Sequence, residues 1–269
     1  MPELPEVETS RLGLLPHLLG QSIERVLVRN ASLRWPVAPE VMQLRKAKVQ
    51  SLGRRGKYLL FDFAEGQMLV HLGMSGSLRL VNASQPPGKH DHVDWLLADG
   101  RCLRLTDPRR FGAVLWNRQG EAHPLLAHLG VEPLAPGFAG DYLADRAQGR
   151  KQSVKTFIMD AKVVVGVGNI YAQESLFLAG IHPTRSVNRI SRASWQRLAS
   201  AIVTVLQAAL AAGGTSLRDF TRTDGKPGYF KQELRVYGRG GEPCLACGHP
   251  IRLIRQGQRS TCYCPHCQK

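Results

Sequence analysis

Two Cys-x-x-Cys pairs near the C-terminus constrain most tightly how this chain can fold. Cys244 and Cys247 form the first pair, and Cys264 and Cys267 form the second after 16 intervening residues. Each pair places two thiolates on one tight turn, and two such turns complete a tetrahedron of soft ligands that suits zinc. Four thiolates leave no open coordination position, so we expect one structural zinc ion. The alternative ligands in this segment, His249 and His266, are not needed.

The residues between the two pairs are expected to form a β-hairpin. Residues 251–254 and 260–263 alternate as short strands do, and the turn at 256–258 contains a glycine. This arrangement places Arg259 near the hairpin tip, pointing away from the metal. The two remaining cysteines, Cys102 and Cys262, are interpreted as a buried strand residue and a bystander of the metal site.

The charge of the chain favours a polyanionic partner. The 269 residues include 36 Lys and Arg against 21 Asp and Glu, a net charge of +15. Basic residues gain affinity for phosphates by releasing counterions, which favours nucleic acid. An anionic membrane fits less well, because there is no basic amphipathic helix and no apolar stretch near the roughly 20 residues of a membrane span. The acidic start lacks the features of a secretory signal, so we expect a cytoplasmic protein.

The pattern of the first half of the chain predicts a β-sandwich domain with a leading helix. Residues 5–20 are typical of a helix that Pro16 kinks and Gly20 ends. Short alternating runs between turn residues follow, and several such strands at this spacing favour a sandwich. The expected strands are 23–28, 58–63, 68–72, 77–81, 95–98, 102–106 and 113–116.

The second half of the chain is expected to be helical. A segment rich in Pro and Gly at 132–140 indicates a linker, and helices are expected at 154–161, 171–179 and 194–212. We therefore predict an α+β multidomain protein. Its expected parts are a sandwich domain with a leading helix at 1–132, a linker at 133–150, a helical domain at 151–234 and a zinc finger at 235–269.

The amino terminus offers a candidate nucleophile. An initiator Met before the small Pro2 is normally removed, which leaves a secondary amine. An α-amino group has a pKa near about 8, against about 10.4 for lysine, so more of it is free to attack a carbon centre at neutral pH. Glu3 is placed to move protons and Glu6 to hold the geometry. Taken alone, such a start is more typical of a solvated terminus or a helix cap.

The start MPELPEVET resembles that of the formamidopyrimidine-DNA glycosylases, bacterial enzymes that repair oxidised purines. Related endonuclease VIII-like enzymes share the helical domain and the zinc finger but differ in these opening residues, which favours the purine branch. Further segments resemble the same family in order along the whole chain: HLGMSGSL (71–78), KHDHVD (89–94), TDPRRFG (106–112), VVGVGNIYAQESLF (164–177), DGKPGYF (224–230) and VYGRGGEPC (236–244).

This resemblance implies a fold and an activity. The fold is a two-layer β-sandwich, a helix–two-turn–helix domain and a β-hairpin zinc finger, with duplex DNA bound between the domains. The activity is that of a bifunctional glycosylase and abasic-site lyase, acting on 8-oxoguanine, formamidopyrimidines and abasic sites. We expect a monomer, which suits a single asymmetric lesion. The strand is cleaved by β- and then δ-elimination through a Schiff base.

The resemblance also assigns catalytic roles. The amine of Pro2 is the nucleophile, Glu3 is the proton donor and Glu6 is a supporting acid. Lys57 takes part in the strand-cleaving elimination, although alone it is typical of a basic strand edge. Arg259 takes part in the second elimination and binds phosphate, which agrees with the bidentate grip of a guanidinium.

Three further residues are expected to contact DNA, Asn169 through a phosphate. Asn169 follows a Gly-Val-Gly turn at a helix start, where backbone amides suit a phosphate; alone, this motif is weak. The resemblance directs His90 toward DNA, whereas its neighbours His92, Asp91 and Asp94 alone suggest a metal cluster. A DNA contact that is usually lysine in the family falls on Arg150 at the best register.

Base flipping leaves a gap in the duplex that the protein must fill. The resemblance assigns this role to Met74, Arg109 and Phe111, with Arg109 facing the orphaned cytosine. Without it, Met74 and Phe111 are typical of a core. The loop at about 215–229 is expected to cover the flipped base.

Two other functions compete with this interpretation. One is an enzyme of the same superfamily that removes oxidised pyrimidines. The other is a non-catalytic zinc-finger protein that binds damaged DNA, which the set of Pro2, Glu3, Lys57 and Arg259 argues against, because binding alone needs no N-terminal amine.

Overall fold

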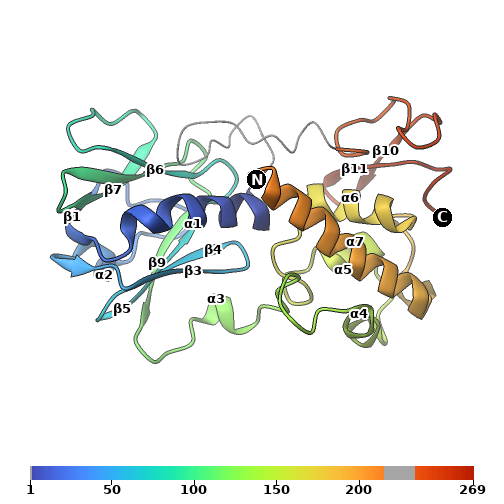
Figure 1. Ribbon diagram of the computed structural model, residues 1–269, viewed down its shortest axis with the longest axis horizontal. Helices are drawn as coiled ribbons and strands as arrows, with labels where there is room; N and C mark the ends of the chain where they lie inside the picture. Colours follow the sequence, from blue (N-terminus) through green and yellow to red (C-terminus); the bar gives the residue numbers. More distant parts are fainter. Residues whose placement is uncertain (1, 215–233) are drawn as a thin grey trace. The chain divides into compact units, whose positions relative to one another are not determined.

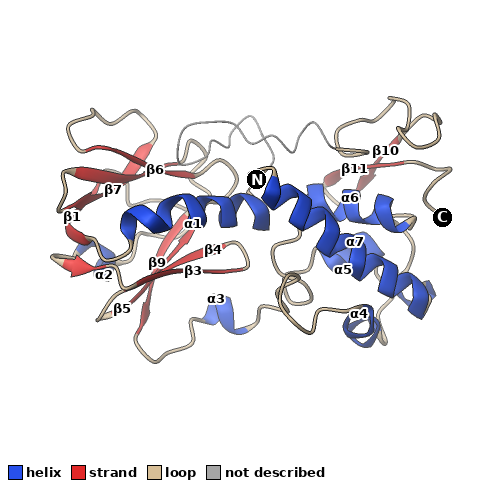
Figure 2. Ribbon diagram, in the orientation of Figure 1, coloured by secondary structure: helices blue, strands red, loops and turns tan. Residues whose placement is uncertain are grey.

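A computed structural model describes residues 2–214 and 234–269 and divides them into two compact units. The first unit holds residues 2–127 and 212–214, and the second holds 128–211 and 234–269. Figure 1 traces the two units along the chain, and Figure 2 shows that strands prevail in the first and helices in the second. The loop expected at about 215–229 lies outside the described residues.

The first unit contains two antiparallel sheets. Their strands run in the orders β2-β1-β7-β8-β6 and β3-β4-β5-β9. Buried apolar side chains such as Phe61, Met68 and Trp95 belong to one core cluster, so the two sheets form the predicted sandwich. The strands are β1 (Ser22–Val28), β2 (Ala47–Lys48), β3 (Ser51–Arg55), β4 (Tyr58–Asp62), β5 (Gly66–His71), β6 (Ser77–Asn82), β7 (Asp91–Leu97), β8 (Arg101–Thr106) and β9 (Ala113–Arg118).

Helix α1 (Leu4–Leu18) precedes the sandwich and buries Val7, Leu14 and Leu18 in its core. Pro5 lies in the first turn, where its missing N–H is not needed. Pro16 lies inside the last turn and does not split the helix, which continues to Leu18. Two single turns, α2 (Pro39–Met42) and α3 (Pro124–Ala127), complete the helices of this unit among the described residues.

The second unit is built around the long helix α7 (Arg192–Ala211), against which α4 (Gly140–Ala147) and α6 (Asn169–Ala179) pack. The short α5 (Val154–Ile158) places Phe157 against Trp195, with the ring centroids 5.5 Å apart. A 3-10 turn (Val187–Arg189) precedes α7. The finger hairpin consists of β10 (Arg252–Gln256) and β11 (Arg259–Tyr263), which pair as the sequence predicts.

Part of the predicted linker at 133–150 is helical. Helix α4 lies within it, and Leu143 and Ala147 are buried. Gly140 approaches α7 so closely that an added Cβ would lie 2.4 Å from the backbone nitrogen of Gln196. This glycine therefore permits helix packing and does not mark a flexible connection.

The described residues contain no helix that is both long and apolar enough to span a membrane.

Candidate functional site

The amino-terminal residues are held in place by the start of α1. The backbone N–H of Glu3 donates a 2.8 Å hydrogen bond to Oε2 of Glu6, which closes the first turn of the helix. Both carboxylates are buried, with Glu3 2% and Glu6 0% exposed. Pro2 is buried next to them, and its nitrogen becomes an amine only when Met1 is removed. Gly214 borders Glu6, because a Cβ added there would lie 3.4 Å from the Glu6 side chain.

Lys57 lies in the tight turn between β3 and β4. Arg54 braces this turn, since its guanidinium donates to the carbonyl of Gly56 at 2.9 Å and to Glu8 of α1 at 2.9 Å. Gly56 has a φ of 56°, a conformation that favours glycine. Helix α1 and the Lys57 turn are therefore coupled by a partly buried ion pair.

The loops that carry Met74 and Phe111 are packed backbone against backbone. Gly73 has a φ of 63°, and a Cβ there would lie 2.3 Å from the backbone of Phe111. Only glycine fits this approach. Phe111 is 44% exposed, and the Arg109 guanidinium lies 4.9 Å from the centre of its ring. The exposure of a large aromatic ring on a braced loop is what an inserted residue requires, and it contradicts the assignment of Phe111 to the core.

Asp107 connects these loops to His90, and the sequence interpretation did not identify it. Its carboxylate accepts 2.8 Å and 2.7 Å hydrogen bonds from the Ser75 hydroxyl and the Gly112 N–H. Its backbone N–H donates to the carbonyl of His90, and its carbonyl oxygen contacts Nε2 of His92 at 2.8 Å. Asp107 is 0% exposed, so it fixes three candidate DNA-contacting segments from a buried position.

Replacing Asp107 by alanine is expected to destabilise the protein by about 3 kcal/mol, because it leaves two buried donors unpaired at about 1–3 kcal/mol each. Urea unfolding followed by tryptophan fluorescence measures this loss. The matched control is Asp99→Ala, whose exposed pair with Arg101 contributes at most about 1 kcal/mol. Equal stability losses in the two variants would contradict the bracing role.

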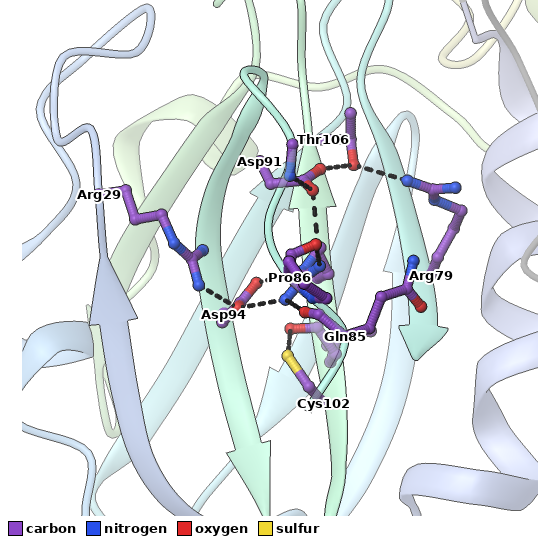
Figure 3. Close-up of polar contacts among 11 residues, drawn as sticks. Arg29, Arg79, Gln85, Pro86, Asp91, Asp94, Cys102 and Thr106 are labelled. Carbon is purple, nitrogen blue, oxygen red and sulfur yellow. Dashed lines mark hydrogen bonds and ion pairs between the residues drawn. The ribbon is translucent and has the colours of Figure 1, made fainter. Parts of the chain in front are cut away.

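The segment that leads to His90 is anchored by a buried ion network (Figure 3). Arg104 is 2% exposed and donates to both oxygens of Asp94 at 2.9 Å and to the carbonyls of Gln85 and Pro86. Arg29, which directly follows β1, also pairs with Asp94. Burial raises the pKa of Asp94, but the hydrogen bonds from Arg104 and Arg29 outweigh burial and hold that pKa below its ordinary value. The acidic residues near His90, which are Asp91 and Asp94, therefore bind arginine side chains. This pairing argues against a metal cluster around His90.

His71 is expected to stay neutral down to acidic pH. Its Nδ1 accepts a 3.0 Å hydrogen bond from the Gly73 N–H, which requires an unprotonated nitrogen. Burial, followed by the charges of Lys57 and Arg34, lowers the pKa of His71 from 6.5 to about 4. Because the unfolded chain binds this proton more readily, the stability contributed by neutral His71 is complete above about pH 6.5 and is lost as the pH falls toward 4.

An NMR titration of the histidine rings tests this expectation. The His71 resonances should not move between pH 8 and about 5. A His71→Asn variant should lose less stability than the wild type over the same acidic range. A His71 midpoint near 6.5 would show that this ring is not protected.

In the second unit, Asn169 begins α6 and lies beside the finger hairpin. Its amide nitrogen donates to the carbonyl of Ser260 at 3.2 Å. Lys155 is 1% exposed, and its ammonium group donates 2.6 Å hydrogen bonds to Oδ1 of Asn169 and the hydroxyl of Thr261. Arg259 precedes these hairpin residues and is exposed. The buried Lys155 therefore connects Asn169 to strand β11, at the residues that directly follow Arg259.

Arg150 contacts two side chains of the second unit. It pairs with Asp160 at 3.8 Å, and its guanidinium lies 5.6 Å from the Phe157 ring centre. Its side chain is 35% exposed, which leaves a charged end accessible to solvent.

Glu174 anchors the chain that enters the finger. Its carboxylate accepts hydrogen bonds from the backbone N–H groups of Arg235, Val236 and Tyr237 at 2.8–3.0 Å. Burial raises the pKa of Glu174 despite these three donors. A buried carboxylate with three amide donors is a positioning element, because it fixes the path of the backbone at the start of the finger.

The four cysteines predicted as zinc ligands converge. The Sγ atoms of Cys244 and Cys267 are 4.0 Å apart and those of Cys247 and Cys264 are 3.5 Å apart, and all four ligand atoms lie within 4.8 Å of one another. Tetrahedral zinc with bonds of about 2.3 Å requires sulfur atoms about 3.8 Å apart. The donor set therefore fits one structural zinc ion.

Comparison with known families gives the class of the protein. Residues 1–114 match the formamidopyrimidine-DNA glycosylase N-terminal domain, and residues 129–221 match the H2TH domain of the same enzymes. Residues 241–269 match the zinc finger found in FPG and IleRS. The chain thus combines a β-sandwich, a helix–two-turn–helix domain and a zinc-finger hairpin.

Similar sequences and structures give the family. The formamidopyrimidine-DNA glycosylases of Alcanivorax borkumensis and Escherichia coli O6:H1 are 57% and 55% identical over 269 residues, which is all of this chain and all of theirs. The MutM (Fpg) structure from Thermus thermophilus is 37% identical, with a TM-score of 0.90 over 99% of this chain and 98% of that one. This chain therefore belongs to the formamidopyrimidine-DNA glycosylase family.

Structures of Lactococcus lactis Fpg with DNA have the same fold. A complex of an Fpg variant with DNA that contains Fapy-dG has a TM-score of 0.93 at 33% identity and covers both chains completely. A complex with DNA that contains an abasic site has a TM-score of 0.92 at 32% identity and covers 99% of each chain.

Proposed function

We propose that this protein excises oxidised purines from duplex DNA and then cleaves the abasic strand. The observation that carries the proposal is the pair of buried carboxylates, Glu3 and Glu6, fixed beside Pro2 by the first turn of α1. The secondary amine supplies the nucleophile that base excision needs, and the buried carboxyl group beside it supplies the proton transfer. Full-length identity of 54–57% to formamidopyrimidine-DNA glycosylases supports the same activity.

The proposed reaction begins at the amine of Pro2. The nitrogen attacks the C1′ carbon of the sugar, the bond to the base breaks, and the base leaves with the proton that the nitrogen gives up. The carboxylic acid of Glu3 then delivers its proton to the ring oxygen as the bond between C1′ and that oxygen opens, and the sugar remains attached as an iminium ion. Abstraction of a C2′ proton then expels the 3′ phosphate, and a second elimination expels the 5′ phosphate. Lys57 and Arg259 assist these eliminations, and hydrolysis of the iminium releases the sugar fragment.

The proposed DNA contacts follow from exposure and bracing. Asp107 fixes the loops that carry Met74, Arg109 and Phe111. Residues that are inserted into DNA need such rigid support. Asn169 and His90 are the proposed phosphate contacts, and Arg150 with its partly exposed guanidinium is a third. We also propose domain limits near residues 132 and 234, action as a monomer and a place in the bacterial cytoplasm, which the bacterial origin of the relatives supports.

The test is borohydride trapping on a duplex with 8-oxoguanine opposite cytosine, followed by mass spectrometry of the adduct. We expect a covalent complex at Pro2 in a protein that has lost Met1. Tight binding without an adduct, in protein with Met1 removed, would favour a non-catalytic damage-binding protein. A preference for thymine glycol over 8-oxoguanine would favour the pyrimidine branch.

The role of Arg259 is tested separately. Replacing Arg259 by alanine is expected to stop cleavage after β-elimination, because the exposed guanidinium no longer holds the phosphate for the second step. Gel analysis of the 3′ end measures this change, and Arg255→Ala on the neighbouring strand is the control. A product that still carries phosphates at both ends would contradict the assignment.

A further inference from the structure

Beside the four cysteines, the finger carries two histidines with no assigned role. The rings of His249 and His266 are stacked in parallel, with centroids 4.5 Å apart and an interplanar angle of 4°. Both side chains are exposed. One nitrogen of each ring and Sγ of Cys247 all lie within 4.8 Å of one another. Three donors that suit transition metals therefore meet on the surface of the finger.

The two metal knuckles fix the backbone of both histidines. The carbonyl of His249 accepts a 2.8 Å hydrogen bond from the N–H of Cys244, and Pro243 pairs with Pro250 across this turn. His266 lies between two cysteine ligands, in a turn closed by a hydrogen bond from the Gln268 N–H to the carbonyl of Cys264. A metal can therefore gather these ligands by rotation of exposed side chains alone, which costs little free energy compared with backbone movement.

Electrostatics favours a cation at this place. Four thiolates around one Zn²⁺ give the metal cluster itself a formal charge of −2. Each thiolate sulfur keeps a lone pair after it has bound the zinc, and Cys247 is the ligand that faces the two imidazoles. A second cation at this position gains two nitrogen ligands and the attraction of the negative cluster.

We propose that His249, His266 and the bridging sulfur of Cys247 form a second metal site, for a divalent transition ion that accepts imidazole and thiolate ligands. The ion shares the Cys247 sulfur with the structural zinc and completes its coordination with water. Binding displaces water and any proton on the imidazoles and changes no oxidation state. The site is separate from the proposed catalytic residues, so it does not depend on the glycosylase activity.

The experiment uses the full-length zinc protein, first shown by elemental analysis to contain one zinc. Co²⁺ is then added, and the zinc and cobalt that remain after gel filtration are measured together with the ultraviolet spectrum. We expect the wild type to keep its zinc and take up one cobalt, with a thiolate-to-cobalt charge-transfer band. His249→Ala and His266→Ala are each expected to weaken cobalt binding by at least about tenfold while the zinc is retained.

The matched control is His128→Ala, which removes another exposed histidine and should leave cobalt binding unchanged. Retained zinc in all variants shows that the finger is folded. Cobalt uptake that only replaces zinc, or that persists in both finger variants, would overturn the proposal. A bound cobalt without the thiolate band would overturn the bridging role of Cys247.

Discussion

Blocking the amine of Pro2 is expected to abolish excision and trapping together. A protein with an N-terminal extension has an amide nitrogen at Pro2, which has no lone pair available to attack a sugar carbon. We expect the rate of 8-oxoguanine excision to fall by at least about a thousandfold, the scale on which removal of a nucleophile acts in other enzymes. Single-turnover cleavage of a labelled duplex measures the loss, and borohydride trapping reports the covalent step.

Two controls separate the missing nucleophile from a misfolded protein. The same tag at the C-terminus leaves Pro2 free and should leave excision near the wild-type rate. The N-terminally tagged protein should still bind lesion DNA, because the Asp107 loops and the finger are unchanged. Excision at the wild-type rate by the N-terminally tagged protein would show that the nucleophile lies elsewhere. The variant Pro2→Gly, which keeps a primary amine, should show reduced excision.

Much of this fold could be predicted because its signals are local. The finger hairpin follows from cysteine spacing and a glycine turn, and β10 and β11 pair where the sequence indicates. Strands such as β8 and β9 follow from alternation between turn residues. Strand β3 was not predicted, because its sequence, Ser-Leu-Gly-Arg-Arg, has a single apolar side chain and pairs only through its partner β4. Helix α4 was not predicted either, because the proline and glycine residues before it indicated a linker.

The residues that position the site could not be predicted in the same way. Asp107, Lys155 and Glu174 each act on partners that folding alone brings close, such as Ser75 and Thr261. Asp107 and Glu174 lie in sequence motifs whose other members were assigned roles, and Lys155 lies outside every motif. Burial is the property that distinguishes them, because a buried charge must have partners, and burial depends on tertiary contacts.

Removal of the zinc ion is expected to unfold the finger and weaken DNA binding by more than about 100-fold, equivalent to the loss of about 3 kcal/mol in charged contacts. The apolar cluster of the finger contains few residues, with Phe177, Val236 and Ile251 beside the cysteines. So small a cluster cannot hold the hairpin alone, whereas a structural zinc contributes about 10–16 kcal/mol in finger peptides. Chelation followed by a binding titration on lesion duplex measures the loss, and added zinc should restore affinity.

The effect of zinc removal should extend into the helical part of the second unit. Thr261 and Ser260 on β11 are bound by the buried Lys155, and the N–H of Cys262 donates to Gln173 of α6. When the hairpin unfolds, the Lys155 ammonium loses a buried partner, and the Asn169 amide loses the carbonyl of Ser260. Hydrogen exchange should therefore rise at the start of α6, while the sandwich core around Trp95 keeps its protection. Unchanged exchange at α6 in zinc-free protein would show that Asn169 is positioned without the finger.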